Sequence, residues 1–327
     1  MMKTIRQLLI IACLALGCES DTGEAELIKL SVAFTLNLTM APVFITHAEG
    51  FFEEQGLDVE LVGIESAATA LPALLQGRLD VLPGPLSPSF FNAITRGGRL
   101  RLVGDKGTFM ADDCFHQALV VSAKTIERGE PIVLRRVGTA KDPFFQFFVE
   151  RALLENGFDP ADIELVHVPQ AAEYDAIVAG RLDAAMIGEP WLTRILKKGG
   201  VVWTPTNELL DGYNYSAFVF GPRLLDQDPE LGERFAVAML KGIRRYNEGK
   251  TARNLEILGD ALGHDPDELR DVCWPAMRDD GQINAAGILD FQRWGLARGD
   301  LDALVPAEEF WEPRFMEHAA RVLDGGS

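Results

Sequence analysis

The tetrapeptide Gly77-Arg-Leu-Asp80 occurs a second time in this chain, as Gly180-Arg-Leu-Asp183. Another pair of matching stretches lies upstream in the same order, since Glu54-Gln-Gly-Leu-Asp58 corresponds to Glu155-Asn-Gly-Phe-Asp159. The second copy carries a three-residue insertion, Pro160-Ala-Asp162, before its next apolar stretch. Two matches in the same order and at nearly the same spacing indicate an internal repeat. The sequence therefore predicts two lobes of similar design.

The residues around the first copy alternate between strand and helix patterns. Strand patterns cover 28–34 and 57–62, helical patterns cover 41–55 and 67–76, and a third strand pattern begins at Val81. This alternation predicts crossover connections and a largely parallel sheet. We therefore expect an α/β protein with two lobes and mixed, mostly parallel sheets.

Clusters of Gly, Asp and Asn at 107–113 and 207–216 predict where the chain crosses between the lobes. We assign residues 27–110 and 216–327 to lobe 1 and residues 111–215 to lobe 2, with the C-terminal helices completing lobe 1. Ligands of open α/β sheets bind outside the carboxyl ends of the strands. The expected binding site is therefore a cleft between the two lobes.

Residues 1–18 have the layout of a secretory signal peptide, in which basic residues precede an apolar run from Leu8 to Leu16. The run is shorter than the about 20 residues that a membrane-spanning helix needs. A small residue before Cys18 resembles a lipobox, so we predict a lipoprotein with Cys18 lipidated, and simple cleavage is the alternative. Residues 19–26 would form a polar tether. The expected location is the periplasm or the cell surface, with a lipid anchor in a bacterial membrane.

The formal net charge of the chain is −18. Nucleic acid is excluded as a partner, because phosphate binding needs clustered Lys and Arg. The five histidines are scattered along the chain without the spacing of metal ligands. We therefore expect no metal and no cofactor.

Cys114 and Cys273 are the two cysteines beyond the leader segment. An oxidising compartment permits a bridge between them, but one pair is no disulfide framework, and we expect two separate buried thiols. Cys114 and His116 would share a face of a strand, which makes them the best candidates for a nucleophile and its base. No third orienting group, nucleophile elbow or phosphate loop accompanies them. We therefore expect a binding protein and not an enzyme.

Three stretches, Ala41–Glu60, Ala73–Asp80 and Gly188–Trp191, resemble signatures of the NMT1/THI5-like family. This family comprises solute-binding proteins for the uptake of nitrate, sulfonate, taurine and thiamine pyrimidines. The resemblance implies the hinged two-lobed fold of periplasmic binding proteins (type II, or Venus flytrap). It also implies a small-molecule ligand, and an ABC permease with its ATPase as partners. The chain is expected to act as a monomer. The alternative that the resemblance leaves open is an enzyme of the same fold in thiamine-pyrimidine or related cofactor biosynthesis.

Lobe 1 supplies polar candidates for ligand binding at the ends of its strands. Side chains with hydroxyl and amide groups follow the first strand. Residues with hydroxyl groups also lie at the start of the helix after the second strand, where backbone N–H groups are free. Ser66 is equally explained as a helix N-cap, and Ser87 as a turn residue. The lobe 1 candidates are Thr35, Asn37, Thr39, Ser66, Thr69 and Ser87.

Lobe 2 supplies charged and aromatic candidates. Asp142 is expected to cap a helix that begins at Pro143, and a carboxylate beside an indole at Glu189 and Trp191 suits an amine-bearing or heteroaromatic solute. Packing is the alternative role of Trp191, and hinge packing that of Tyr213. The lobe 2 candidates are Thr139, Lys141, Asp142, Glu189, Trp191 and Tyr213. Four phenylalanines are expected in the core, with a ligand-facing wall as the alternative: Phe144, Phe145, Phe147 and Phe148.

The charge balance of these candidates predicts a neutral to acidic cleft. Asp142 and Glu189 face one Lys141, and the lobe 1 candidates are neutral. Placing a buried anion beside Glu189 would cost several kcal/mol. The sequence therefore favours a neutral or amine-bearing ligand, such as a pyrimidine-like heterocycle that stacks on Trp191.

Overall fold

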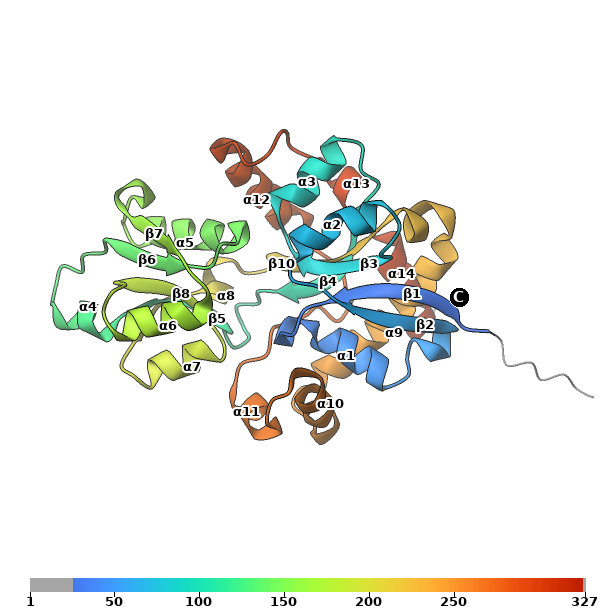
Figure 1. The fold of residues 1–327 in the computed structure, drawn as a ribbon, viewed down its shortest axis with the longest axis horizontal. Coiled ribbons are helices and arrows are strands. Elements are labelled where there is room, and N and C mark those ends of the chain that lie inside the picture. Colours follow the sequence, from blue (N-terminus) through green and yellow to red (C-terminus); the bar gives the residue numbers. More distant parts are fainter. Residues whose placement is uncertain (1–25, 326–327) are drawn as a thin grey trace, which may run out of the picture.

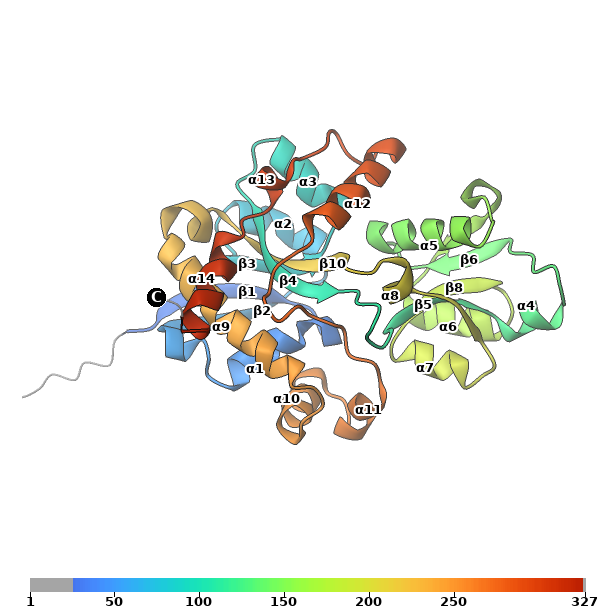
Figure 2. The same ribbon diagram turned by 180° about the vertical axis from the view of Figure 1, so that it is seen from behind.

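The computed structural model describes residues 26–325 of the 327-residue chain (Figure 1). The predicted signal peptide, Cys18 and most of the predicted tether lie outside the described residues. The described chain forms two halves, each with a five-stranded sheet that helices cover on both faces (Figures 1 and 2). We call the half that contains β1 lobe 1 and the other half lobe 2.

The sheet of lobe 1 has the strand order β2-β1-β3-β10-β4. Its strands are β1 (Ile28–Phe34), β2 (Leu57–Gly63), β3 (Val81–Pro85), β4 (Arg101–Thr108) and β10 (Asn214–Phe220). β1 is parallel to β2 and β3, and β10 is antiparallel to β3 and β4. Because β10 lies between β3 and β4, lobe 1 is completed by chain that has already passed through lobe 2.

The sheet of lobe 2 has the strand order β7-β6-β8-β5-β9. Its strands are β5 (Gln117–Val121), β6 (Arg136–Thr139), β7 (Glu164–His167), β8 (Ala184–Gly188) and β9 (Val201–Pro205). β6 is parallel to β7 and β8, and β5 is antiparallel to β8 and β9. One strand in each sheet is antiparallel to the others. This strand is β10 in lobe 1 and β5 in lobe 2. The predicted two-lobed α/β fold with mixed, mostly parallel sheets is confirmed.

Helices connect the strands and cover the sheets. Those that precede β10 are α1 (Ala41–Ala48), α2 (Ala67–Leu75), α3 (Pro88–Thr95), α4 (Ala123–Glu127), α5 (Pro143–Glu155), α6 (Gln170–Val178), α7 (Trp191–Leu196) and α8 (Thr206–Leu209). Those that follow β10 are α9 (Pro229–Asn247), α10 (Ala252–Leu262), α11 (Pro266–Asp271), α12 (Ala285–Arg298), α13 (Ala307–Phe310) and α14 (Arg314–Leu323). The short turns are η1 (Leu38–Met40), η2 (Glu53–Gln55), η3 (Pro160–Asp162) and the π-helical η4 (Arg223–Gln227). The insertion in the second repeat copy is therefore the turn η3.

The helix predicted over 41–55 is shorter in the structure. It ends at Ala48, and Gly50 adopts a left-handed backbone conformation with φ of 73°. Residues other than glycine adopt this conformation at a cost, so glycine commonly ends helices. The sequence prediction treated this glycine as part of the helix and was wrong there.

The repeated aspartates hold corresponding strands in the two lobes. Asp80 accepts hydrogen bonds from the backbone N–H and the hydroxyl of Ser31 in β1, at 2.8 and 3.0 Å. Asp183 accepts them from the backbone N–H groups of Arg135 and Arg136, at 2.9 and 3.0 Å. Arg136 begins β6, so the repeated tetrapeptide ties the central strand that follows it, β3 or β8, to the neighbouring parallel strand, β1 or β6.

The helices after β10 do not all pack on lobe 1, contrary to the prediction. Phe291 of α12 lies with its ring centroid 5.4 Å from that of Phe144 in α5 of lobe 2, and Trp294 of α12 lies 5.6 Å from Phe147. The indole N–H of Trp294 donates to Glu150 of α5 at 2.8 Å. The aromatic face of α12 needs apolar partners, and the phenylalanines of α5 provide them. One apolar core therefore extends through both lobes.

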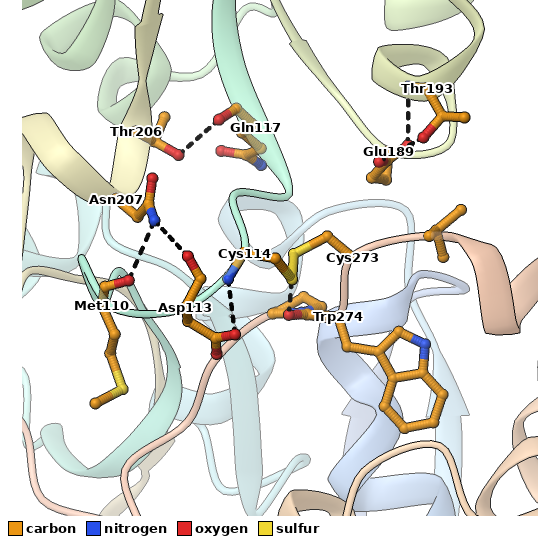
Figure 3. Close-up of a disulfide and its surroundings, with 12 residues drawn as sticks. Met110, Asp113, Cys114, Gln117, Glu189, Thr193, Thr206, Asn207, Cys273 and Trp274 are labelled. Atoms are coloured by element: carbon orange, nitrogen blue, oxygen red, sulfur yellow. Dashed lines mark hydrogen bonds between the residues drawn. A yellow bond between two sulfur atoms is a disulfide. The ribbon is translucent and has the colours of Figure 1, made fainter.

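Cys114 and Cys273 form a disulfide (Figure 3). The expectation of two separate buried thiols is wrong. Cys114 lies between β4 and β5, and Cys273 follows α11, so 159 positions separate them. The chain after Cys273 returns alongside β4, where the N–H of Thr108 donates to the carbonyl of Ala276 at 3.0 Å. This return brings the two cysteines together and ties the first crossing between the lobes to the segment after α11.

Candidate ligand-binding site

A cavity of about 550 Å³ lies between the two lobes. Lobe 1 contributes residues beyond the carboxyl ends of β1 and β3, and lobe 2 contributes residues beyond those of β6 and β8, as expected for open α/β sheets. A third wall comes from α10, α11 and the residues that follow them. The polar and charged side chains in the lining are Thr35, Asn37, Thr39, Lys106, His116, Gln117, Asp142, Gln170, Glu189, Arg194, Ser216, His264 and Glu268.

Three predicted residues form one hydrogen-bonded group on the lobe 1 wall. The carbonyl oxygen of the Asn37 side chain accepts from the N–H and the hydroxyl of Thr39, at 3.1 and 2.6 Å. The amide nitrogen of Asn37 donates to the Thr35 hydroxyl at 2.8 Å. Asn37 caps η1 in this way, so the turn after β1 fixes all three side chains at the edge of the cavity.

Lys106 of β4 also lines this wall, although sequence reasoning missed it. Its side chain is buried, and Nζ donates to the hydroxyls of Thr39 and Ser216, at 2.7 and 3.2 Å. Burial lowers the pKa of Lys106 to about 7, although the neighbouring Asp105 favours its charged form. The available signal was a charged pair, Asp105-Lys106, inside a strand pattern.

Asp105 points away from the cavity, to the opposite face of β4. Burial raises the pKa of Asp105 to about 6, against the hydrogen bonds that favour its charged form. Its carboxylate accepts from the backbone N–H groups of Arg278 and Gly107, both at 2.8 Å, and from the Asn214 amide at 2.9 Å. Asp105 therefore holds the C-terminal segment and the second crossing against β4.

The carboxylates on the lobe 2 wall both cap helices. Asp142 accepts from the N–H of Phe144 at the start of α5, at 2.9 Å, and burial raises its pKa. Glu189 accepts from the N–H and the hydroxyl of Thr193 in α7, at 3.1 and 2.8 Å (Figure 3). The carboxylate of Glu189 is therefore engaged by its own lobe, whereas the sequence prediction left it free for a ligand amine.

Trp191 is half-buried at the start of α7 and lines the cavity. Its ring centroid lies 5.3 Å from that of Tyr174, and the guanidinium of Arg194 lies over the indole at 4.7 Å. Phe145 lines the cavity as well, whereas Phe144, Phe147 and Phe148 are buried in the core. The helical stretch therefore supplies one phenylalanine to the cavity wall.

Six predicted site residues do not line this cavity. The Ser66 hydroxyl caps α2 by accepting from the N–H of Thr69 at 3.3 Å, and Thr69 is exposed. Thr139 is fully buried and Lys141 is exposed. The six residues are Ser66, Thr69, Ser87, Thr139, Lys141 and Tyr213.

Tyr213 and Ser87 have other partners. The Tyr213 hydroxyl donates to Asp290 of α12 at 2.8 Å, so it joins the second crossing to the C-terminal helices. The Ser87 hydroxyl lies 2.9 Å from that of Ser89. These contacts correct the placement expected for both residues at the cavity.

The cysteine–histidine pair has no free thiol. Cys114 is in the disulfide, so it has no thiolate to act as a nucleophile. His116 is buried next to Phe109, with ring centroids 5.6 Å apart, and burial lowers its pKa to about 4. The best catalytic candidate from the sequence is therefore excluded for the oxidised protein.

Residues 26–325 contain neither a cluster of metal-ligating side chains nor a membrane-spanning helix. No group of three or more His, Cys, Asp or Glu side chains in this range could hold a metal ion. No helix within the same residues combines the length and the apolar character that crossing a bilayer requires.

The sequence profile of the NMT1-like family matches residues 23–110 and 139–258, which is more than half of the chain. The chain belongs to the NMT1-like family. The resemblance predicted from the sequence motifs is thereby confirmed. A curated relative of this NMT1-like protein is the putative binding protein YtlA of Bacillus subtilis, 23% identical over 240 residues, which cover 71% of this chain and 70% of YtlA.

Solved structures share the fold of this NMT1-like protein. The ligand-binding component of an ABC-type import system from Staphylococcus aureus has a TM-score of 0.72 at 14% identity, covering 90% of this chain and 99% of that one. The periplasmic aliphatic sulphonate-binding protein SsuA of Escherichia coli has a TM-score of 0.68 at 15% identity, covering 87% and 97%. The desulfurization enzyme DSZB has a TM-score of 0.63 at 16% identity, covering 90% and 99%. The fold is thus shared by binding proteins and by an enzyme.

Proposed function

We propose that this protein is an extracytoplasmic solute-binding protein of an ABC-type importer, which captures a small organic solute between its lobes and delivers it to a permease. The observation that carries the proposal is the cavity of about 550 Å³ at the strand ends of both lobes. Closure of two lobes on a shared ligand favours the ligand-bound state. Membership of the NMT1-like family supports this function, as does the similarity to the putative binding protein YtlA and to the sulphonate-binding protein SsuA.

The volume of the cavity favours an organic ligand. Pockets for drug-sized molecules measure about 300–1,000 Å³, and the cavity lies within this range at about 550 Å³. Apolar side chains of both lobes line it beside the polar groups, including Leu36, Phe145 and Trp191. We infer a heterocyclic, amine-bearing or sulfonate-like solute, larger than a bare nitrate ion.

The enzyme alternative, in thiamine-pyrimidine or related biosynthesis, has weaker support. It draws on the fold shared with DSZB. Its candidate nucleophile, Cys114, is held in the disulfide with Cys273.

Several further properties belong to this proposal. The partners are an ABC permease and its ATPase, and the protein acts as a monomer. Cys18 carries the lipid anchor that holds the protein at the periplasmic or outer surface of a bacterial membrane. Lobe 1 comprises residues 27–110 and 216–327, and lobe 2 comprises residues 111–215. A Cys18→Ala variant that still sediments with membranes like the wild type would refute the anchor.

Native mass spectrometry of gently purified protein tests the central proposal. We expect a retained small molecule that stabilises the protein by about 2.7 kcal/mol when added at about 100 times its Kd. The compound should be recovered unchanged after prolonged incubation. Conversion of the compound into a product by the purified protein would favour the enzyme instead.

A further inference from the structure

Two of the three carboxylates that line the cavity accept hydrogen bonds from their own lobe. Asp142 caps α5 through the N–H of Phe144, and Glu189 accepts from the N–H and the hydroxyl of Thr193 in α7. The third, Glu268 of α11, is exposed and lies 3.7 Å from Nδ1 of His264 in the same wall. A ligand amine at Asp142 or Glu189 would therefore share the carboxylate with these donors.

The two cations that line the cavity, Lys106 and Arg194, have no carboxylate partner among the described residues. Within the part of the chain that the structure describes, neither Lys106 nor Arg194 forms an ion pair with a carboxylate. Arg194 lies over the Trp191 ring on lobe 2, while Lys106 is buried on lobe 1. The carboxylate next to Lys106 in sequence, Asp105, is committed to the other face of β4. Burying a charge without a counter-charge is costly.

The hydrogen bonds around Lys106 leave one N–H donor of its ammonium group without a protein partner in the described part of the chain. The hydroxyl of Thr39 donates to Asn37 at 2.6 Å, and that of Ser216 donates to the carbonyl of Gly84 at 2.8 Å. Both hydroxyl protons are thus used elsewhere, and the two oxygens accept from Lys106. An ammonium group has three N–H donors. Two of them serve Thr39 and Ser216, so one remains for an acceptor in the cavity.

We propose that Lys106 determines the specificity of this cavity and selects an organic anion, whose acidic group accepts the remaining N–H of Lys106. This inference rests on the proposed function and narrows its ligand to a carboxylate or a sulfonate. The apolar part of the ligand lies against Phe145 and Trp191 of lobe 2 and Leu269 of α11, which line the same cavity. The neutral or amine-bearing ligand favoured by the sequence fits less well, because that expectation omitted Lys106 and left Glu189 free.

Binding of an anion should also take up a proton. Burial holds the pKa of Lys106 at about 7, so near neutral pH part of the unliganded protein carries an uncharged amine at this position. A bound anion favours the ammonium form and raises the pKa. Affinity should therefore be constant below pH 7 and fall as the pH rises above it. Asp105 is the charged neighbour of Lys106. The other titratable groups that line the cavity are His116, Asp142, Glu189, Arg194, Tyr215, His264 and Glu268.

Calorimetric titration with matched probes tests the proposal. Benzoate and an alkanesulfonate serve as anions, benzamide as the neutral counterpart of benzoate, and an aminopyrimidine as the heterocycle. We expect an anion to bind the wild type, and Lys106→Met to weaken it about 30-fold, as expected for the loss of a hydrogen bond to a charged group. Lys141→Met removes a lysine of the same region that lies outside the cavity, and it should leave affinity unchanged. Thermal unfolding of both variants verifies that they fold.

Proton uptake provides a second readout. At pH 7.5 the binding heat of the wild type should depend on the ionisation enthalpy of the buffer, whereas Lys106→Arg should bind without this dependence because arginine stays protonated. Failure of every anion at millimolar concentration, or equal loss in the Lys141→Met control, overturns the assignment of Lys106. Tight binding of benzamide or the aminopyrimidine, undiminished in Lys106→Met, also overturns it but leaves the proposed solute-binding function intact. Turnover of a probe would instead contradict the proposed function.

Discussion

The two copies of the repeated tetrapeptide are completed in different ways. In lobe 1 the carboxylate of Asp80 is paired with Arg223, which follows β10. In lobe 2 the carboxylate of Asp183 is paired with Arg128, which directly follows α4. Both partners of the lobe 2 ion pair thus come from the continuous stretch that forms lobe 2. In lobe 1 the arginine comes from the chain that follows the second crossing between the lobes.

The sheets of the two lobes also differ in how much distant chain they contain. All strands of lobe 2 come from one continuous stretch, β5 to β9. In lobe 1, β10 fills the sheet late, and the C-terminal segment runs along β4, where the N–H of Asp105 donates to the carbonyl of Gly281 at 2.8 Å. Repeated motifs therefore specify similar local structure in both lobes, while the stability of lobe 1 depends more on distant chain. Four predictions follow this contrast.

Removal of the disulfide should have the largest effect, because it ties the first crossing to the C-terminal segment of lobe 1. The double variant Cys114→Ser, Cys273→Ser opens a loop that spans 159 positions. Loop-closure entropy suggests a loss of about 5 kcal/mol in the free energy of unfolding. Urea denaturation measures this loss, and hydrogen exchange should rise first in residues 273–284. An increase confined to lobe 2 would contradict the contrast between the lobes.

The aspartates of the repeat give the next largest effect. Asp183→Ala leaves two backbone N–H groups, those of Arg135 and Arg136, without an acceptor. Asp80→Ala leaves one backbone N–H and a hydroxyl of Ser31, and the hydroxyl is free to rotate toward water. We expect losses of about 3 kcal/mol for Asp183→Ala and about 2 kcal/mol for Asp80→Ala. Chemical denaturation of the two variants compares them, and a larger loss for Asp80→Ala would show that the backbone donors are not decisive.

The sequence predicts the fold through these repeated motifs, because they are local. The repeat tetrapeptides, the alternation of strands and helices and the strand-end candidates Thr35, Asn37 and Thr39 all depend on residues close together in the chain. The same rule predicted Asp142 and Glu189 correctly as residues beyond strand ends that line the cavity, although not their roles as helix caps.

What the sequence could not predict depends on distant contacts. Lys106 faces the cavity from within β4, because β10 positions Ser216 beside it. The pairing of Cys114 with Cys273 follows from the return of the C-terminal segment along β4. The packing of α12 on α5 likewise joins aromatic faces that no local pattern connects.

The two repeat copies also differ in a buried carboxylate, which should make the stability contributed by lobe 2 depend on pH. Glu173 lies as far before Gly180 as Ala70 lies before Gly77, and both positions are buried. Neither carboxylate oxygen of Glu173 has a hydrogen-bond partner in the described structure, and burial raises its pKa to about 8. The corresponding position in lobe 1 therefore carries no such titration.

Glu173 should make the stability of the protein depend on pH. Because its folded pKa is raised, its protonated form stabilises the fold at low pH, and this contribution is lost as the pH rises toward 8. Glu173→Gln should match the wild type near pH 5 and exceed its free energy of unfolding by about 3 kcal/mol at pH 8. Denaturation curves at several pH values measure the difference. Parallel curves for the two proteins would show that Glu173 is ionised at neutral pH.

The glycines of the repeat should give the smallest contrast. Gly77 and Gly180 have φ values of 67° and 69°, which an alanine adopts only at a cost of about 1 kcal/mol. A β-carbon at Gly77 would meet no atom within 4 Å, whereas one at Gly180 would lie 2.4 Å from Cδ of Lys124, whose ammonium donates to the carbonyl of Ala179 at 2.8 Å. Gly180→Ala must displace that side chain, so we expect a loss of about 2 kcal/mol against about 1 kcal/mol for Gly77→Ala. In a Lys124→Ala background Cδ and Cγ are absent and only the β-carbon at 3.2 Å remains, so the additional cost of Gly180→Ala should fall toward that of Gly77→Ala. Thermal and urea unfolding of this set measures the coupling between the two positions, and a Gly180→Ala cost that is the same with and without Lys124 would assign the whole effect to the backbone.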